Sequence, residues 1–136
     1  MAFREKLAWS AFATTVFAWG GYFVAVVALP LEGPSLFWLF VAATVTQAVL
    51  LAAAATFAAL SAPGDAHTAK DERDRAVDGQ ATTIAYMIVL AALIGVIIWL
   101  HFGLHGANAV LALIGVFILG EAARYGAQAI GYRRAS

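Results

Sequence analysis

The sequence predicts an all-α integral membrane protein: a four-helix bundle of two antiparallel transmembrane hairpins, with both termini in the cytoplasm. Three observations support this fold class. Of the 136 residues, 63% are hydrophobic and the mean hydropathy is +0.86, well above the roughly 45–50% apolar content of soluble domains. Four apolar runs reach about the 20 residues that a bilayer core of ~30 Å requires. All Lys and Arg side chains lie on one side of these runs.

The four predicted spans cover about residues 7–29, 36–62, 83–102 and 107–123, within a single domain of residues 1–136. Pro30 ends the first span, and Pro63-Gly64 ends the second. The first apolar run is longer than the ~7–15 residues of a signal peptide, and no A-x-A-like site precedes Pro30, so we expect it to be retained. A polar segment, residues 63–82, joins the second and third spans. A tail, residues 124–136, follows the fourth.

The placement of Lys and Arg predicts the orientation, because cytoplasmic loops of membrane proteins are enriched in positive charge. The eight positive side chains all lie in the two terminal segments or in the 63–82 segment: Arg4, Lys6, Lys70, Arg73, Arg75, Arg124, Arg133 and Arg134. The two opposite connections, residues 30–35 and 103–106, carry none. We therefore expect a multi-pass protein of the inner (cytoplasmic) membrane whose termini and 63–82 segment are cytoplasmic.

Neutral polar side chains form a predicted layer inside the membrane. Counted from the outer ends of the spans, Trp19 lies at the depth of Gln47, and Tyr22 lies at the depth of Thr44. An amide at mid-membrane needs partners, so we expect Gln47 to bond to the first span, a contact worth ~0.6 kcal/mol. The alternative is a small-molecule or lipid pocket lined by the same four residues. No span has a charged residue in its middle, which disfavours proton-coupled transport.

Metal and thiol chemistry find little support in the sequence. The chain has no cysteine, which excludes disulfides and thiolate ligands. His101 and His105 are four residues apart, a spacing that metal or haem ligation can use on a helix. Gly103 and Gly106 are expected to break the helix there, and no third ligand is close in sequence. We predict no metal site, no cofactor and no enzymatic activity.

The charged run KDERDRAVD, residues 70–78, is predicted to begin a helix that leads into the third span. Thr68 and Asp71 have the spacing of an N-cap and its N3 acidic residue. Asp71 and Arg75 are at i and i+4, the order that favours an ion pair. Gly79 is expected to interrupt this helix before the membrane.

The same run is a candidate surface for a cytoplasmic partner. Its alternatives are a solvated helix start with internal ion pairs, or pairing of its carboxylates with the arginines of the tail. Those arginines have a second expected role at the lipid headgroups. The candidate interaction residues are Asp71, Glu72, Arg73, Asp74, Arg75, Arg133 and Arg134.

Residues 70–89 resemble the segment before the third helix in a family of uncharacterised small four-span bacterial and archaeal membrane proteins. The matching positions are Asp71, Glu72, Arg73, Asp74, Val77 and Tyr86. Residues 8–23 are similar to that family's first helix and residues 108–134 to its last, with Asn108, Glu121, Tyr132, Arg133 and Arg134 in place. Gly79, Gln80 and Ala81 depart from the family pattern. The resemblance implies no catalytic activity and a role beside a cytoplasmic regulator, such as a small helix-turn-helix protein.

These observations favour a non-enzymatic membrane protein, a sensor or anchor that engages a cytoplasmic partner through residues 65–80 and the tail. Two alternatives stay open: a small-molecule or lipid-binding or transport bundle, and an accessory subunit of a larger membrane complex. The lipid bilayer is an expected partner, homo-oligomers are compatible with the sequence, and the zero net charge gives no indication of nucleic-acid binding.

Overall fold

The structure is a computed structural model that describes residues 3–61, 63–66 and 70–134. These residues form five helices and no strand. The helices are α1 (Phe3–Ala28), α2 (Pro34–Ser61), α3 (Pro63–Ala66), α4 (Glu72–His101) and α5 (Gly106–Arg134). Four of them, all except the short α3, are long and apolar enough to cross a membrane. The all-α class is therefore confirmed, and each of the four predicted spans falls in a helix that is long and apolar enough to cross a membrane.

The helices extend beyond the predicted spans at the end where the charged residues lie. α4 begins at Glu72, within the charged run as predicted and ahead of the span expected from residue 83, and α5 continues through the predicted tail to Arg134. Gly79 does not interrupt α4, contrary to the prediction from sequence. A glycine costs a helix only ~1 kcal/mol relative to alanine, and the carbonyl of Gly79 accepts a hydrogen bond from the Thr83 hydroxyl at 3.0 Å.

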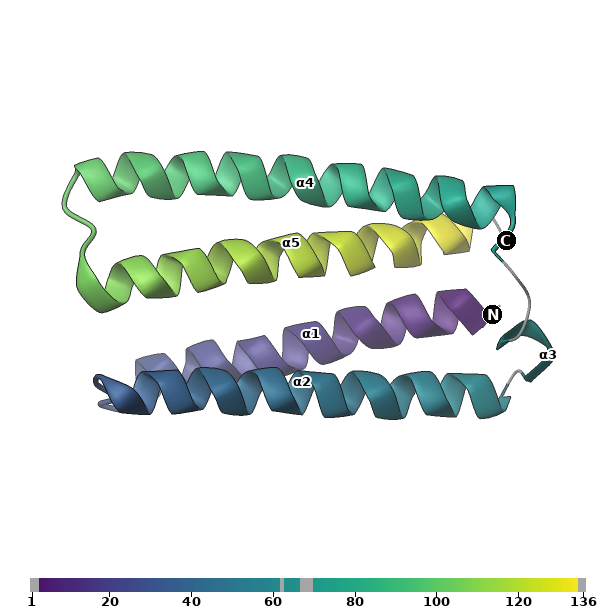
Figure 1. The fold of residues 1–136 in the computed structure, drawn as a ribbon, viewed down its shortest axis with the longest axis horizontal. Helices are drawn as coiled ribbons and strands as arrows, with labels where there is room; N and C mark the ends of the chain where they lie inside the picture. The colour runs from purple at the N-terminus through teal and green to yellow at the C-terminus, as the bar shows by residue number, and fades with distance from the viewer. Residues whose placement is uncertain (1–2, 62, 67–69, 135–136) are drawn as a thin grey trace.

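The long helices pack in the order α2, α1, α5, α4 (Figure 1). α1 contacts α2 and α5, and α4 packs mainly on α5, whereas α2 has no packed long-helix neighbour besides α1 among the described helices. A cluster around the buried rings of Trp19 and Tyr22 fills the junction of α1, α2 and α5. α1 is consequently the most buried of the four candidate spans.

Both chain termini and α3 lie at the same end of the molecule in Figure 1, which we call the terminal end. The short connections from α1 to α2 and from α4 to α5 lie at the opposite end. Gly103 and Gly106, with φ angles of 110° and 55°, turn the chain between α4 and α5. The predicted helix break at these glycines is confirmed, because α4 ends at His101 and α5 begins at Gly106.

Two glycines allow close approach of α4 and α5. A Cβ atom added to Gly120 would lie 2.5 Å from Cγ2 of Val89, and one added to Gly131 would lie 2.7 Å from Cγ1 of Val77. Small residues at such positions let membrane helices pack with their backbones close together. Gly131 therefore brings the last turns of α5 against the first turns of α4.

Candidate functional site

The beginning of α4 is fixed by a capping box. Asp71 is the N-cap: its carboxylate accepts a hydrogen bond from the Asp74 backbone N–H at 2.7 Å, and the Asp74 carboxylate accepts one from the Asp71 N–H at 3.3 Å. Such a box satisfies two backbone donors that the first helical turn leaves open. The predicted cap, Thr68, lies outside the described residues, and the observed cap is three residues later.

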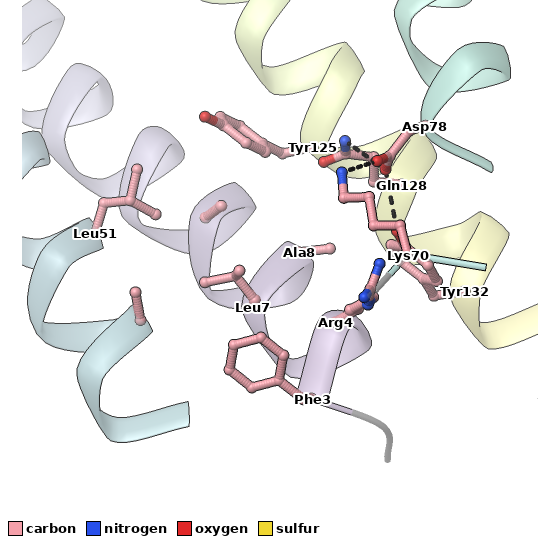
Figure 2. Close-up of a pocket in the computed structure, with 12 residues that line it drawn as sticks. Phe3, Arg4, Leu7, Ala8, Leu51, Lys70, Asp78, Tyr125, Gln128 and Tyr132 are labelled. Atoms are coloured by element: carbon pink, nitrogen blue, oxygen red, sulfur yellow. Dashed lines mark hydrogen bonds and ion pairs between the residues drawn. The ribbon is translucent and has the colours of Figure 1, made fainter. Parts of the chain in front are cut away.

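Asp78 is the centre of a polar cluster at the terminal end. Its Oδ1 atom accepts hydrogen bonds from the Tyr132 hydroxyl at 3.0 Å and from Gln128 Nε2 at 3.1 Å, while Oδ2 pairs with Lys70 Nζ. Figure 2 shows these four side chains converging from α5 and from the start of α4. We call Lys70, Asp78, Gln128 and Tyr132 the Asp78 cluster. It joins the second turn of α4 to the last turns of α5.

A separate ion pair joins α1 to α4. Arg4 Nη1 lies 2.8 Å from Asp74 Oδ2, and both side chains are about four-fifths buried, with exposed fractions of 20% and 18%. Asp74 therefore belongs to the capping box and also binds the first turn of α1. Together with the Asp78 cluster, this contact gathers the beginning of α1, the beginning of α4 and the end of α5 into one assembly.

The Asp78 cluster changes the acidity of its members, which lie outside the predicted spans. Burial raises the pKa of the Asp78 carboxyl, but the hydrogen bonds from Lys70 and Tyr132, the charge of Lys70 and the Gln128 hydrogen bond lower it more. The net result is a pKa below the ordinary aspartate value. Burial and the hydrogen bond to Asp78 raise the pKa of Tyr132 to about 12. The ionised carboxylate and the neutral phenol therefore stabilise each other.

A cleft of about 450 Å³ lies beside this cluster. Residues of α1, α2 and α5 line it, together with Lys70 and Asp78 at the start of α4. In Figure 2 Arg4 and the Asp78 cluster lie at one end of the cleft, whereas Leu7 and Leu51 line its apolar part. The Tyr125 hydroxyl points away from the polar end.

The other predicted interaction residues stay at the surface. Asp71, Glu72, Arg73 and Arg75 are exposed, as are Arg133 and Arg134 at the end of α5. Within the described part of the chain, the expected ion pair of Asp71 with Arg75 is absent, and neither tail arginine pairs with a carboxylate of residues 71–78. α5 reaches those carboxylates through Tyr132 and Gln128 instead.

Neither Gln128 nor Tyr132 was among the interaction residues predicted from the sequence. Gln128 and Tyr132 are four residues apart, so that they share one face of α5. This pairing of polar groups at i and i+4 near the end of an apolar helix was the available signal. It became specific only once α4 supplied a carboxylate opposite that face.

The intramembrane polar layer joins α1 to α2. The Trp19 indole N–H donates to Gln47 Oε1, and Gln47 Nε2 donates to the Thr15 hydroxyl at 2.9 Å. The predicted bond between Gln47 and the first span is thus confirmed, with Thr15 as an additional, fully buried partner. Tyr22 is buried nearby, whereas Thr44 is exposed and donates to its own helix at Phe40.

The two histidines are not placed on one helical face. His101 is the last residue of α4, with Nδ1 2.8 Å from the Ile97 carbonyl oxygen, and His105 lies in the connection to α5. Among the described residues, no group of three or more His, Asp or Glu side chains is placed to hold a metal ion.

No protein-family model matches the sequence, and neither a curated protein nor a solved structure matches it.

Proposed function

We propose that this protein is a non-enzymatic, four-span protein of the cytoplasmic membrane that docks an acidic cytoplasmic protein on its terminal end. The observation that carries the proposal is the division of the charged residues there. Asp74 and Asp78 are engaged in contacts with α1 and α5, whereas Arg73 and Arg75, on either side of Asp74 in the sequence, are exposed. Asp71 is occupied as the N-cap of α4, so that Glu72 is the exposed carboxylate left beside these arginines.

The end of α5 contributes to the same surface. The hydrogen bond from Tyr132 to Asp78 holds the last turn of α5 beside the second turn of α4. Arg133 and Arg134, the next two residues, are exposed. We define the docking surface as Arg73, Arg75, Arg133 and Arg134. Its excess of arginine favours an acidic partner surface, because planar guanidinium groups bind carboxylates in bidentate geometry.

The proposal requires the terminal end to be cytoplasmic, with α1–α2 and α4–α5 as antiparallel hairpins. The distribution of Lys and Arg supports this orientation, since all eight belong to segments at that end. The resemblance of residues 71–74 to the DERD-type motif of small four-span proteins also supports it, because that resemblance implies a cytoplasmic regulator as partner.

Labelling of introduced cysteines tests the orientation without background labelling of this protein, because the chain has no cysteine of its own. Glu32 precedes α2 at the end opposite the termini, and Ala76 is exposed in the first turns of α4. A membrane-impermeant maleimide should label Glu32→Cys in intact cells and Ala76→Cys only after permeabilisation. Labelling of Ala76→Cys in intact cells would contradict the orientation and the docking proposal together.

Site-specific photo-crosslinking in cells tests the docking. A photoreactive residue in place of Ala76 should crosslink one cytoplasmic protein with an acidic surface, and the same residue in place of Glu32 should not. Reversing Arg73→Glu and Arg75→Glu should lower the yield of that crosslink at least about fivefold, since like charges placed opposite each other cost several kcal/mol.

The matched control reverses two positive charges outside the docking surface, Lys6→Glu and Arg124→Glu. It makes the same change in net charge and should leave the crosslink yield within about a factor of two. Equal losses in the two double variants would show a general charge effect, and we would then abandon the docking surface.

A further inference from the structure

We propose that a groove between α4 and α5 binds an anionic phospholipid from the leaflet at the terminal end. The phosphate of the lipid lies at Arg134, and one acyl chain follows the groove toward Leu119. This groove is separate from the cleft beside the Asp78 cluster, because no residue of that cluster lines it. The inference goes beyond the docking proposal, since its ligand is a lipid, and Arg134 is the one residue that the groove shares with the docking surface.

The groove is hollow because many of the residues that line it are small. Ala81 on α4 and Ala123 and Gly126 on α5 lie along it, and Ile84 and Ile88 add aliphatic walls. Its volume of about 830 Å³ lies within the ~300–1,000 Å³ of ligand pockets. These walls suit an acyl chain.

The length of the groove matches one leaflet of a bilayer. From Leu119 to Arg134 it follows α5 for about 22 Å, at 1.5 Å per residue. Half of a bilayer, headgroups included, measures about 20–22 Å. Leu119 and Ile88 lie within the predicted spans, whereas Arg134 lies beyond them. The groove therefore runs from the headgroup region into the hydrocarbon core, a depth that a lipid occupies and that a cytoplasmic protein does not reach.

The polar end of the groove carries an unpaired cation. Arg134 is the single charged residue among those that line it. In the described part of the chain, Arg134 takes part in no ion pair, in contrast to Arg4 with Asp74 and Lys70 with Asp78. A planar guanidinium group binds a phosphate in bidentate geometry. Arg134 is thus a suitable ligand for a phosphodiester.

The carboxylates nearby leave this positive charge in excess. The three aspartates at the start of α4 are engaged in the capping box or in contacts with α5 and α1. Glu72 lies five residues before Val77, which lines the groove, and is therefore about 140° away from it around the helix axis. Arg73, four residues before Val77, is on the groove side and exposed. The buried Glu5 does not line the groove. Even with Glu5 counted, Arg73 and Arg134 leave one positive charge, which favours an anionic over a zwitterionic headgroup.

The packing order leaves the groove open to the bilayer. α4 lies at one edge of the row of long helices and packs mainly on α5 (Figure 1). Phe12 of α1 is the one lining residue from outside α4 and α5. A lipid can therefore enter laterally and keep its headgroup at the membrane interface.

Native mass spectrometry of the whole protein tests the inference. The protein is titrated with dioleoyl phosphatidylglycerol or with dioleoyl phosphatidylcholine, which have identical chains, and is then released from detergent. We expect the anionic lipid to be retained about tenfold more strongly, the effect of one charge-assisted contact. Arg134→Gln should remove this preference. Arg75→Gln loses the same charge and should keep it, because Arg75 belongs to the docking surface but does not line the groove.

Three results would overturn the proposal. Equal retention of the two lipids by the wild type would show that charge does not select the ligand. Equal losses in the two arginine variants would show a general effect of net charge. A doubled mass without bound lipid would assign the groove to a second copy of the chain.

A further variant and a competitor locate the lipid. Ala123→Phe places a ring in the apolar part of the groove and should also lower retention of phosphatidylglycerol at least about tenfold, with unchanged thermal stability. Full retention by Ala123→Phe would place the lipid elsewhere and contradict the groove assignment. Inorganic phosphate at the lipid concentration should not compete. Competition by phosphate would show a site for a free anion instead of a lipid.

Discussion

The hydrogen bond between Tyr132 and Asp78 should couple the beginning of α4 energetically to the end of α5. A hydrogen bond to a charged group contributes ~1.5–3 kcal/mol. The Asp78 side chain is 21% exposed, so that water can replace part of a lost contact, and we expect about 1–2 kcal/mol for Tyr132→Phe. Asp78→Ala removes two such bonds and the exposed Lys70 pair, which adds at most ~1 kcal/mol. Its expected cost is about 2–4 kcal/mol.

A double-mutant cycle isolates the coupling. The free energy of unfolding is measured in mixed micelles titrated with dodecyl sulfate for the wild type, the two single variants and the double variant. Because the double variant cannot lose the same bond twice, its cost should fall short of the sum of the single costs by about 1–2 kcal/mol. The control is Tyr86→Phe, at a tyrosine that is 60% exposed, where the cost should stay below ~0.5 kcal/mol.

Acidification should remove the same coupling. The folded protein holds the pKa of Asp78 below its ordinary value, so the cluster contributes its full stability above the ordinary carboxyl pKa. That contribution is lost as the pH falls through the lowered pKa of the folded state. Additive single costs at neutral pH, within ~0.5 kcal/mol, or a coupling that persists after protonation of the carboxyl, would refute the reasoning.

Two further predictions concern the packing between helices. Gly120→Ala should destabilise the protein by about 1–2 kcal/mol, because its new Cβ atom would meet the stiff, β-branched side chain of Val89 at 2.5 Å. Gly95→Ala, at a helical glycine with open space around it, should be neutral or stabilising in the same unfolding measurement. Gln47→Leu should cost about 1–3 kcal/mol, since it removes two interhelical bonds and leaves the buried Trp19 N–H without its acceptor. A neutral Gln47→Leu in that assay would contradict a structural role for the polar layer.

The parts of the fold that could be predicted are those that depend on local chemistry. Four apolar runs predict four helices because an unpaired backbone is too costly in lipid. Pro30 and Gly103 mark breaks that the structure contains. The contact between Gln47 and the first helix was predictable for a similar reason, since a mid-membrane amide must find a polar partner at its own depth.

The order in which the helices pack was not predictable from the same patterns. The spans carry no charge in their middle, so that their faces are chemically alike and several arrangements bury similar surfaces. The start of α4 was ambiguous as well, because Thr68 with Asp71 and Asp71 with Asp74 both have capping spacing. The choice between Tyr132 and its neighbour Arg133 as the partner of α4 depends on the rotation of α5 about its axis. Contacts such as that of Gly131 with Val77 accompany this rotation, which hydropathy does not specify.

The interleaved charges at the start of α4 follow from helical phase. Successive residues of an α-helix are about 100° apart around its axis, so residues at i and i+4 share a face. Asp74 and Asp78 share the face that receives Arg4 and Tyr132, and Arg73 and Arg75 point to either side of it. A run of arginines alone would support the proposed orientation but leave α1 and α5 without acceptors. A run of aspartates alone would supply acceptors but remove positive charge from the end that is proposed to be cytoplasmic. The alternating signs therefore place Asp74 and Asp78 on one face of α4 and Arg73 and Arg75 on either side of it. One helix thus supplies both the acceptors for α1 and α5 and the positive charge that supports the proposed orientation.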